Sequence, residues 1–198
     1  MLAQGDHVLI ALSGGPDSIA LLRVLTLIAP SYGLHLTTAH LNHGLRGTEA
    51  QAEEEHARRI SQGMGISCIC KTLDLRSLRQ RSGKSLEEIG RDERYRFLSD
   101  TADRCGAQKI ATGHHRNDQA ETLLINLIRG TGLEGMRGIA PARGKIIRPL
   151  LDVTREEIKT FLDAEGLQYM ADSSNLDPHY LRNRIRNDLI PDLEANYN

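Results

Sequence analysis

The fold of this chain is decided by the stretch HVLIALSGGPDS, which spans residues 7–18. His7–Leu12 is an apolar run typical of a buried strand, and the polar SGGPDS sequence follows it at once. Two glycines permit a tight turn whose amide N–H groups face an anion, and proline suits the first turn of a helix. A helix N-terminus adds partial positive charge. We therefore expect a phosphate-binding loop formed by Ser13, Gly14, Gly15, Pro16, Asp17 and Ser18.

Asp17 is the one acidic residue of this loop, and its carboxylate would repel bare phosphate. A Mg²⁺ ion between the two removes the repulsion, because Mg²⁺ takes carboxylate and phosphate oxygens as ligands. Asp17 is therefore the predicted metal ligand, while the hydroxyls of Ser13 and Ser18 are expected to face phosphate. A plain turn with an Asp/Ser helix cap is the alternative, which the position after the first strand disfavours.

Apolar runs alternate with helical patterns along the rest of the chain. Further strands are expected at Leu34–Leu41, Ile66–Leu73, Lys109–Gly113 and Lys145–Arg148. Helices are expected at about 16–29, 48–63, 85–105, 118–129 and 154–165, with capping boxes at Ser85-x-x-Glu88 and Thr154-x-x-Glu157. This alternation predicts a Rossmann-like three-layer α/β/α fold with a five-stranded parallel sheet. Ligands of such sheets bind beyond the carboxyl ends of the strands.

Composition bounds the class of protein. The 198 residues suit one domain, and the 39% hydrophobic and 26% charged residues are ordinary for a soluble protein. No apolar run is long enough for a membrane span, and three cysteines without a CxxC pair favour a reducing cytoplasm. A net charge of −1 does not mark a nucleic-acid binder, although arginines cluster at 76–81, 91–96 and 182–186. Those clusters are equally typical of solvated helix faces.

Several polar motifs follow the expected strands or lie in the expected helices. In chain order they are HLNHGLR at 40–46, ExxRxxRY at 88–95, HHRNDQAET at 114–122, RPLL at 148–151, DSSN at 172–175 and YxRNRIR at 180–186. SGGPDS resembles the pyrophosphate-binding loop of the N-type ATP pyrophosphatases, the PP-loop superfamily with an adenine nucleotide alpha hydrolase-like fold. The ordered set, from about residue 7 to 191, resembles the N-terminal domain of the tRNA(Ile)-lysidine synthetases.

This resemblance implies a function. The family uses ATP and Mg²⁺ to adenylate the wobble cytidine of the CAU anticodon of a minor tRNA(Ile). L-lysine then displaces AMP, which gives lysidine and leaves pyrophosphate and AMP as the other products. Residues 1–198 would form the N-terminal catalytic domain, with the C-terminal tRNA-binding region of the family outside this chain. A cytoplasmic homodimer without a membrane partner is in keeping with the family.

The family's catalytic polar positions match Arg94, His114, Asp118 and Glu121 of this sequence. Arg94 would neutralise charge on the α-phosphate, and His114, at the end of a strand, would hydrogen-bond phosphate. Asp118 and Glu121 are three apart and share a helix face, so together they suit a lysine ammonium and can accept its proton. The same spacing also fits a helix capping box, and this alternative stays open.

The sequence indicates the roles of several other polar residues less specifically. Arg182, Arg184 and Arg186 are expected to hold RNA phosphates. Asn117 stands where the family often has an acidic residue, which puts a metal or lysine contact there in doubt. The neighbouring His114 and His115 could instead be metal ligands, although their spacing does not favour it. His40 and His43 have a ligand-like spacing, but a structural role or a substrate loop fits them equally.

Two rival functions remain. A tRNA thiolase of the same superfamily would deliver sulfur through paired cysteines or a cluster. Cys68-x-Cys70 is a poor candidate for that, because both side chains are expected on one face of a strand, in the core. A non-catalytic nucleotide-binding module would bind ATP without releasing pyrophosphate, and it would leave the polar set at 114–121 without a purpose.

Overall fold

The computed structural model describes residues 1–44, 48–83, 85–133, 135–170 and 181–197. Its strands are β1 His7–Ala11, β2 His35–Asn42, β3 Ser67–Thr72, β4 Lys109–Ala111, β5 Ala142–Arg143 and β6 Ile146–Ile147. The first helices are α1 Pro16–Tyr32, α2 Thr48–Gly63, α3 Leu75–Ser82, α4 Leu86–Cys105 and α5 Arg116–Ile128. They are followed by η1 Gly135–Arg137, α6 Arg155–Ala164, α7 Leu181–Arg184, the π-helical turn η3 Ile185–Leu189 and α8 Ile190–Tyr197.

The strands form one sheet in the order β3-β2-β1-β4-β6-β5. All neighbouring pairs are parallel except β5 and β6, which form an antiparallel hairpin. The expected five-stranded parallel sheet is therefore wrong by one strand. The added strand, β5, has two exposed residues and carries no apolar alternation that a sequence pattern could detect.

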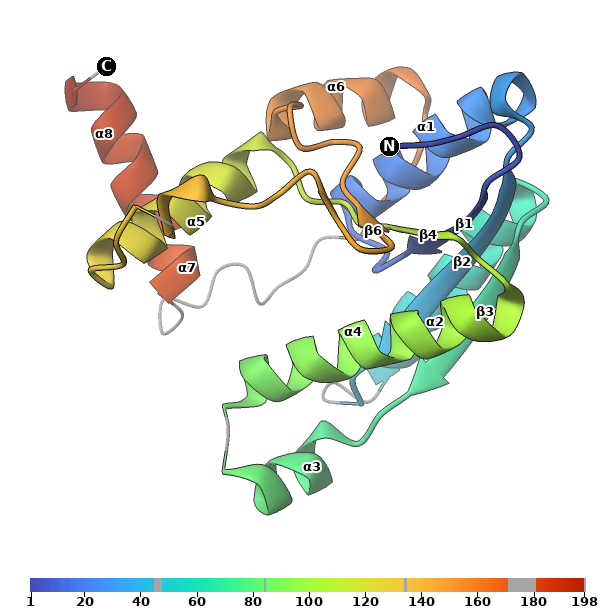
Figure 1. The fold of residues 1–198 in the computed structure, drawn as a ribbon, viewed down its shortest axis with the longest axis horizontal. Coiled ribbons are helices and arrows are strands. Elements are labelled where there is room, and N and C mark those ends of the chain that lie inside the picture. The colour runs from blue at the N-terminus through green and yellow to red at the C-terminus, as the bar shows by residue number, and fades with distance from the viewer. Residues whose placement is uncertain (45–47, 84, 134, 171–180, 198) are drawn as a thin grey trace.

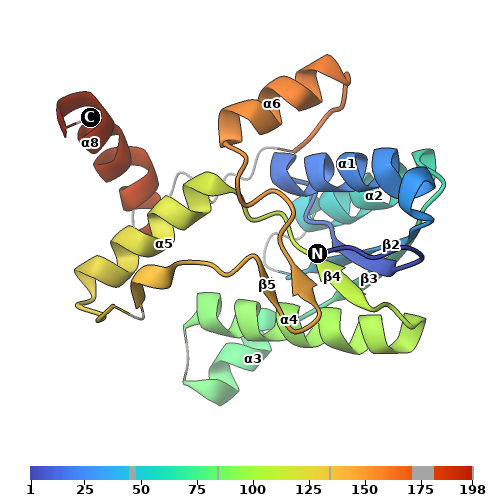
Figure 2. The ribbon, with the colours of Figure 1, turned by 45° about the horizontal axis from the view of Figure 1, so that its top comes forward.

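Two separate cores show that the sheet lies between two helical layers (Figure 1). Val8 and Ile10 of β1 pack with α1, α2 and α6, whereas Leu9 packs with α4 on the opposite face. This alternation follows from the period of two along a strand. Figure 2 shows α1 and α2 on one side of the strands and α4 on the other. The three-layer prediction is confirmed.

The boundaries of the expected helices follow the local signals closely, except at the end of α1. The capping boxes at Ser85 and Thr154 are both present. Helix α1 runs past its expected end to Tyr32 and accommodates Pro30 in its last turn, and Gly33 ends the helix in the left-handed region. Helix α3, the turn η1 and the C-terminal α7, η3 and α8 were not predicted. Asp74 caps α3 by accepting a hydrogen bond from the amide of Ser77. Among the described residues, no helix has the length and apolarity that crossing a bilayer requires.

Candidate active site

The phosphate loop is held in shape by its own last residue. The Ser18 hydroxyl oxygen accepts hydrogen bonds from the amides of Ser13 and Gly14, at 3.1 and 3.2 Å, and donates to the carbonyl of Gly15 at 2.9 Å. Gly14 has a φ of +89°, which favours glycine. Ser18 therefore braces the loop from inside. The amides of the first helical turn, which have no partner within the helix, remain available for phosphate.

The end of β4 packs directly against this loop. A Cβ atom on Gly113 would come within 3.0 Å of the Asp17 carbonyl oxygen. Glycine suits this close approach, because a Cβ atom there would press on the backbone of the phosphate loop. The contact places His114 and the start of α5 beside the phosphate loop, at the point between β1 and β4 where the strand order reverses.

Asp17 lies at the junction of the loop and α5. Its Oδ2 is 3.6 Å from the His115 Nε2, and its buried Oδ1 has no hydrogen-bond partner. Burial raises the pKa of the Asp17 carboxyl and Asp118 adds to the rise, while His115, Arg155 and Arg186 oppose it. A buried carboxylate oxygen without a partner fits a cation ligand, since burying it bare is costly. The described residues contain no group of three or more histidine, cysteine or acidic side chains around a shared metal position.

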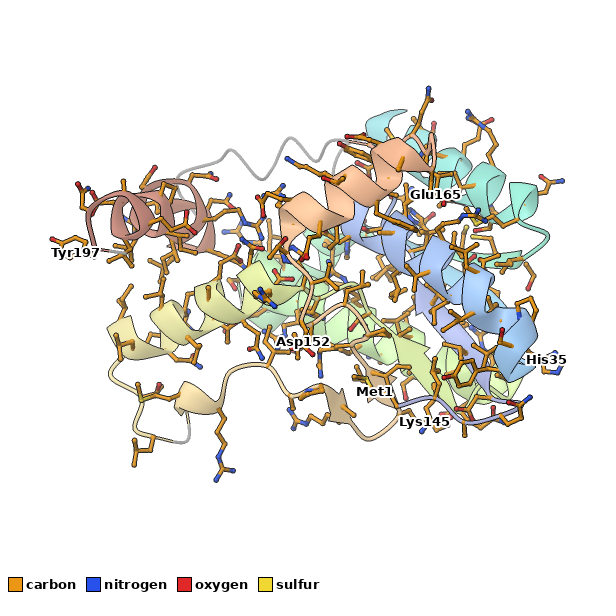
Figure 3. All side chains as sticks on the ribbon, turned by 90° about the horizontal axis from the view of Figure 1, so that it is seen from above. Met1, His35, Lys145, Asp152, Glu165 and Tyr197 are labelled. Atoms are coloured by element: carbon orange, nitrogen blue, oxygen red, sulfur yellow. The ribbon has the colours of Figure 1, made fainter. Side chains whose placement is uncertain are left out.

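The predicted acidic pair faces arginines of the C-terminal helical segment. Glu121 is fully buried; its Oε2 accepts from the Arg182 Nε and its Oε1 from the Arg186 Nε, both at 2.5 Å. Arg182 also bonds the Asp118 Oδ1 at 2.9 Å. Figure 3 shows the helices that end at Tyr197 lying alongside α5. Two of the three arginines expected to bind RNA are therefore engaged with the two carboxylates expected to bind lysine.

The capping alternative for this pair is only partly right. Helix α5 begins at Arg116, so Asp118 lies in its first turn rather than at its N-cap. Asp118 nevertheless caps the helix, because its Oδ2 accepts the His115 amide at 3.0 Å. Glu121 makes no cap, and within the described part of the chain its carboxylate accepts hydrogen bonds from the guanidinium groups of Arg182 and Arg186. The spacing of three between Asp118 and Glu121 therefore serves tertiary ion pairing.

His114 and Arg94 occupy different surroundings. The His114 Nδ1 is 3.0 Å from the Thr112 hydroxyl. Burial lowers the pKa of His114 to about 4; Asp118 opposes this, and Arg148, Arg182 and Arg91 reinforce it. His114 is therefore neutral at neutral pH. Arg94 is exposed on α4, with its Nη2 3.5 Å from the Nε2 of His43, the residue that follows β2.

The lowered pKa of His114 predicts a pH dependence of stability. Between pH 6.5 and about 4 the unfolded chain binds a proton that folded His114 refuses, so the free energy of unfolding falls as pH falls through that window. We expect His114→Gln to flatten this fall in urea denaturation at a series of pH values. His35→Gln, at an exposed histidine, is the control; equal slopes for both variants and the parent would contradict the expectation.

Three residues near the site were not predicted. His115 is buried and has its Nε2 3.6 Å from carboxylate oxygens of both Asp17 and Asp118. Arg155, at the start of α6, adds positive charge near Asp17. Arg148, after β6, is buried. His115 and Arg148 were part of quoted motifs, whereas nothing in the local sequence marked Arg155.

Asn117 has a structural contact that accounts for its amide. Its Oδ1 accepts the backbone N–H of Arg155 at 3.0 Å, which ties α5 to the start of α6. A carboxylate would accept the same bond, so the departure from the family's acidic residue keeps this link. The motif at 172–175 and Tyr180, by contrast, lie outside the described residues, as does Arg46.

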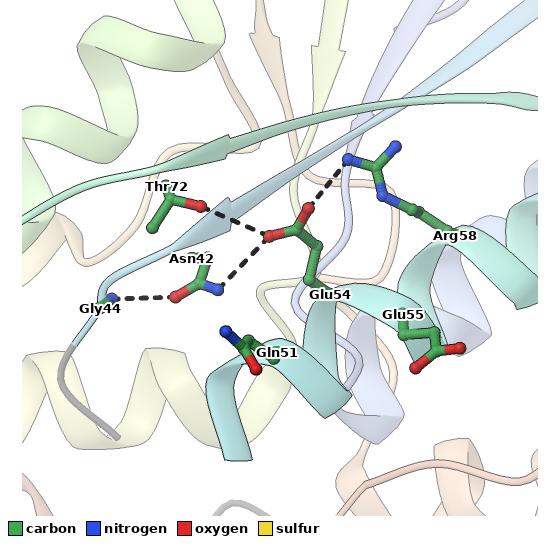
Figure 4. Close-up of a pocket in the computed structure, with 7 residues that line it drawn as sticks. All are labelled: Asn42, Gly44, Gln51, Glu54, Glu55, Arg58 and Thr72. Carbon is green, nitrogen blue, oxygen red and sulfur yellow. Dashed lines mark hydrogen bonds and ion pairs between the residues drawn. The ribbon is translucent and has the colours of Figure 1, made fainter. Parts of the chain in front are cut away.

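A separate polar pocket of about 540 Å³ lies at the carboxyl ends of β2 and β3 (Figure 4). Glu54 on α2 projects into it and accepts bonds from Asn42, Thr72 and Arg58. The Arg58 hydrogen bond lowers the pKa of Glu54. The pocket lies on the β2 and β3 side of the phosphate loop, opposite to His114. Its lining residues are therefore separate from the Asp118 cluster.

These features define a nucleotide-binding α/β domain, with a phosphate loop at the strand-order reversal of a doubly wound sheet. The model of the PP-loop domain matches residues 3–193. The chain therefore belongs to the PP-loop family, and ATP is the nucleotide that this domain implies.

Comparison with known proteins narrows the relationship. The chain is 41% identical to tRNA(Ile)-lysidine synthase of Clostridioides difficile over its whole length, and 43% identical to that of Geobacter sulfurreducens over 96% of it. It spans 43% and 41% of those two proteins, less than half of their length. Its fold matches the U34-tRNA thiolase NcsA of Methanococcus maripaludis with a TM-score of 0.76 at 20% identity, covering 99% of this chain and 68% of that one.

Proposed function

We propose that this chain is the ATP-dependent catalytic domain of a tRNA(Ile)-lysidine synthase. It would adenylate the wobble cytidine of tRNA(Ile) with a CAU anticodon and join L-lysine to it, releasing pyrophosphate and then AMP. The observation that carries the proposal is the physical link from the phosphate loop through His115 to the polar cluster at 114–121. Relatives more than 40% identical over almost all of this chain bear that name.

The phosphate loop would hold the β- and γ-phosphates as the leaving group. The first-turn amides of α1 supply donors and the helix N-terminus supplies partial positive charge. Asp17 would hold Mg²⁺, which supplies charge neutralisation between the carboxylate and the phosphates when bound. Arg155 adds a further cation on the side of Asp17 that faces α6.

The cytidine would enter beyond the end of β4, beside His114. An anticodon-loop base leaves its stack at modest cost, and the alignment of its oxygen with the α-phosphorus supplies much of the rate. Neutral His114, with Nδ1 held near the Thr112 hydroxyl, can hydrogen-bond an oxygen there without adding charge. Arg94 would approach from α4 to offset charge on the α-phosphate.

The lysine amine must lose a proton before it attacks the activated ring carbon. Asp118 and Glu121 stay our candidates for its ammonium, although Arg182 and Arg186 hold both carboxylates. Lysine binding there would therefore exchange one guanidinium for the incoming ammonium. The charge of the cluster would be preserved by that exchange.

RNA binding in this scheme depends on Arg184, the exposed member of the arginine cluster. Arg184→Gln is expected to weaken binding of a CAU anticodon stem-loop and to reduce the slope of log affinity against log salt by about one. Fluorescence anisotropy at several salt concentrations measures this, with the exposed Arg143→Gln on β5 as control. Identical slopes for the two variants would refute the RNA role of Arg184. A homodimer and a cytoplasmic setting accompany this proposal as expectations.

A thiolase remains the second candidate by fold, but the cysteines do not favour it. Cys68 and Cys70 share a face of β3 as predicted, with their Sγ atoms 3.6 Å apart, although they are half-buried rather than in the core. Burial and Cys68 raise the pKa of the Cys70 thiol to about 12, which suppresses the nucleophilic thiolate. β3 is also two strands from the phosphate loop.

The deciding experiment measures pyrophosphate and AMP release from ATP, with and without L-lysine and an unmodified tRNA(Ile) transcript bearing CAU. Mass spectrometry of the RNA then identifies the product. Release that requires the tRNA is the expected result, with the cytidine gaining the mass of lysine less one water, because the ring oxygen leaves with AMP. A sulfur-containing product would favour the thiolase, and nucleotide binding without AMP in any mixture would favour the non-catalytic module.

A further inference from the structure

Arg148 is a buried cation without a carboxylate partner among the described residues. The residue comes directly after β6 in the chain and is only 7% exposed. One guanidinium nitrogen, Nη1, donates to the Ala140 carbonyl at 2.5 Å, and the buried Nε has no hydrogen-bond partner. Arginine stays protonated in proteins, so this site holds a full positive charge away from water. A buried charge of this kind is costly unless an anion completes it.

The neighbourhood has a surplus of positive charge. The charged groups that act most strongly on His114 are one carboxylate, Asp118, and the three guanidinium groups of Arg148, Arg182 and Arg91. Arg182 is bonded to Asp118 and Glu121, and Arg186 completes that four-membered cluster, which is balanced. The guanidinium groups of Arg148 and of exposed Arg91 take no part in this balanced cluster. The charge pattern therefore predicts that an anion lies beside His114.

The position of Arg148 separates its ligand from the phosphates of ATP. β6 pairs with β4, and the Thr112 amide bonds the Ile147 carbonyl, so Arg148 lies next to the strand end that carries His114. β4 in turn separates β6 from β1 and its phosphate loop. Two strand spacings, roughly 10 Å, lie between the two strand ends. The β- and γ-phosphates held at the loop lie that far from Arg148, whereas an extended amino acid that reacts beside β4 reaches it.

We propose that the Arg148 guanidinium binds the α-carboxylate of the amino-acid co-substrate and so selects lysine over amines that lack a carboxylate. This inference rests on the proposed function, because lysine is the co-substrate there. The planar guanidinium fork matches a carboxylate in a bidentate pair, and the nine-tenths buried site suits a small molecule better than a polymer backbone. The acidic cluster at Asp118 lies on the same edge of the sheet, so a zwitterion placed at His114 finds a cation and an anion near it.

The test compares L-lysine with cadaverine, the same diamine without the carboxylate. Titration calorimetry of the chain with an ATP analogue present should show that L-lysine binds about 10- to 100-fold more tightly than cadaverine. Arg148→Gln should remove that difference by weakening L-lysine alone, while Arg148→Lys keeps part of it. Arg143→Gln, in the same hairpin and exposed, should bind both ligands like the parent.

Several outcomes would overturn the inference. Equal affinities of the parent chain for L-lysine and cadaverine would do so without any variant, which matters if Arg148→Gln does not fold. A variant that loses affinity for ATP or RNA, and not for L-lysine, would assign the guanidinium to a phosphate instead. The proposed function is tested separately: an enzyme that adds cadaverine to the RNA as readily as lysine keeps the function and refutes the role of Arg148. If the chain prefers L-lysine to cadaverine but forms no lysidine, the role of Arg148 is supported and the proposed function is refuted.

Discussion

Asp17→Asn is expected to lower pyrophosphate release by about 10³-fold, roughly 4 kcal/mol of transition-state stabilisation. The reason is the position of the carboxylate: its Oδ1 is buried without a hydrogen-bond partner in the phosphate loop, which suits a cation ligand. Asparagine keeps the shape and removes the charge. Because burial raises the pKa of Asp17, the charged form is disfavoured by the fold, and the melting temperature should stay unchanged or rise.

Two measurements separate this role from a structural one. Without Mg²⁺, ATP should bind the Asp17→Asn variant more tightly than the parent, because the carboxylate that repels phosphate is gone. With Mg²⁺, the order should reverse. Asp152→Asn, at an exposed aspartate before α6, should match the parent in both conditions. Pyrophosphate release by Asp17→Asn within twofold of the parent would refute the metal role.

Glu121→Gln should be the most destabilising single change in the site, at about 3–5 kcal/mol. Glu121 is fully buried and its two oxygens bond the guanidinium groups of Arg182 and Arg186. Replacing it leaves two arginines facing α5 with only Asp118 for charge compensation. Urea denaturation gives the free energy of unfolding directly.

A matched ion pair supplies the control for Glu121. Glu165→Gln breaks the pair with Arg23, whose side chains are 29% and 28% exposed, and should cost less than about 1 kcal/mol. If Glu121→Gln proves as stable as Glu165→Gln and only raises the lysine concentration needed for half-maximal rate, Glu121 is a substrate ligand and the arginine contacts are secondary. A double-mutant cycle with Arg186→Gln measures the coupling between the two residues.

Local sequence patterns determined most of the fold. The apolar run His7–Leu12 with its glycine loop predicted β1, the phosphate loop and the start of α1, because each feature is set by residues within one turn or one strand. The capping boxes at Ser85 and Thr154 placed two helix starts to within a residue for the same reason. The two-residue β5 and the short helices α3, α7, η3 and α8 were not predicted, since none is long enough to show a clear period.

In the candidate site, too, some features follow from local sequence and others only from tertiary packing. By itself the sequence determined that a phosphate loop and a polar segment at 114–121 meet at one edge of the sheet, because parallel strands bring their carboxyl ends together. Only the tertiary structure decided that Arg182 and Arg186 pair with Glu121, 61 and 65 residues earlier in the chain, rather than facing outward like Arg184. It likewise decided that Arg148 is buried without a carboxylate partner in the described part of the chain. Spacing along a chain specifies which side chains share a face, whereas which face meets which partner depends on how distant helices pack.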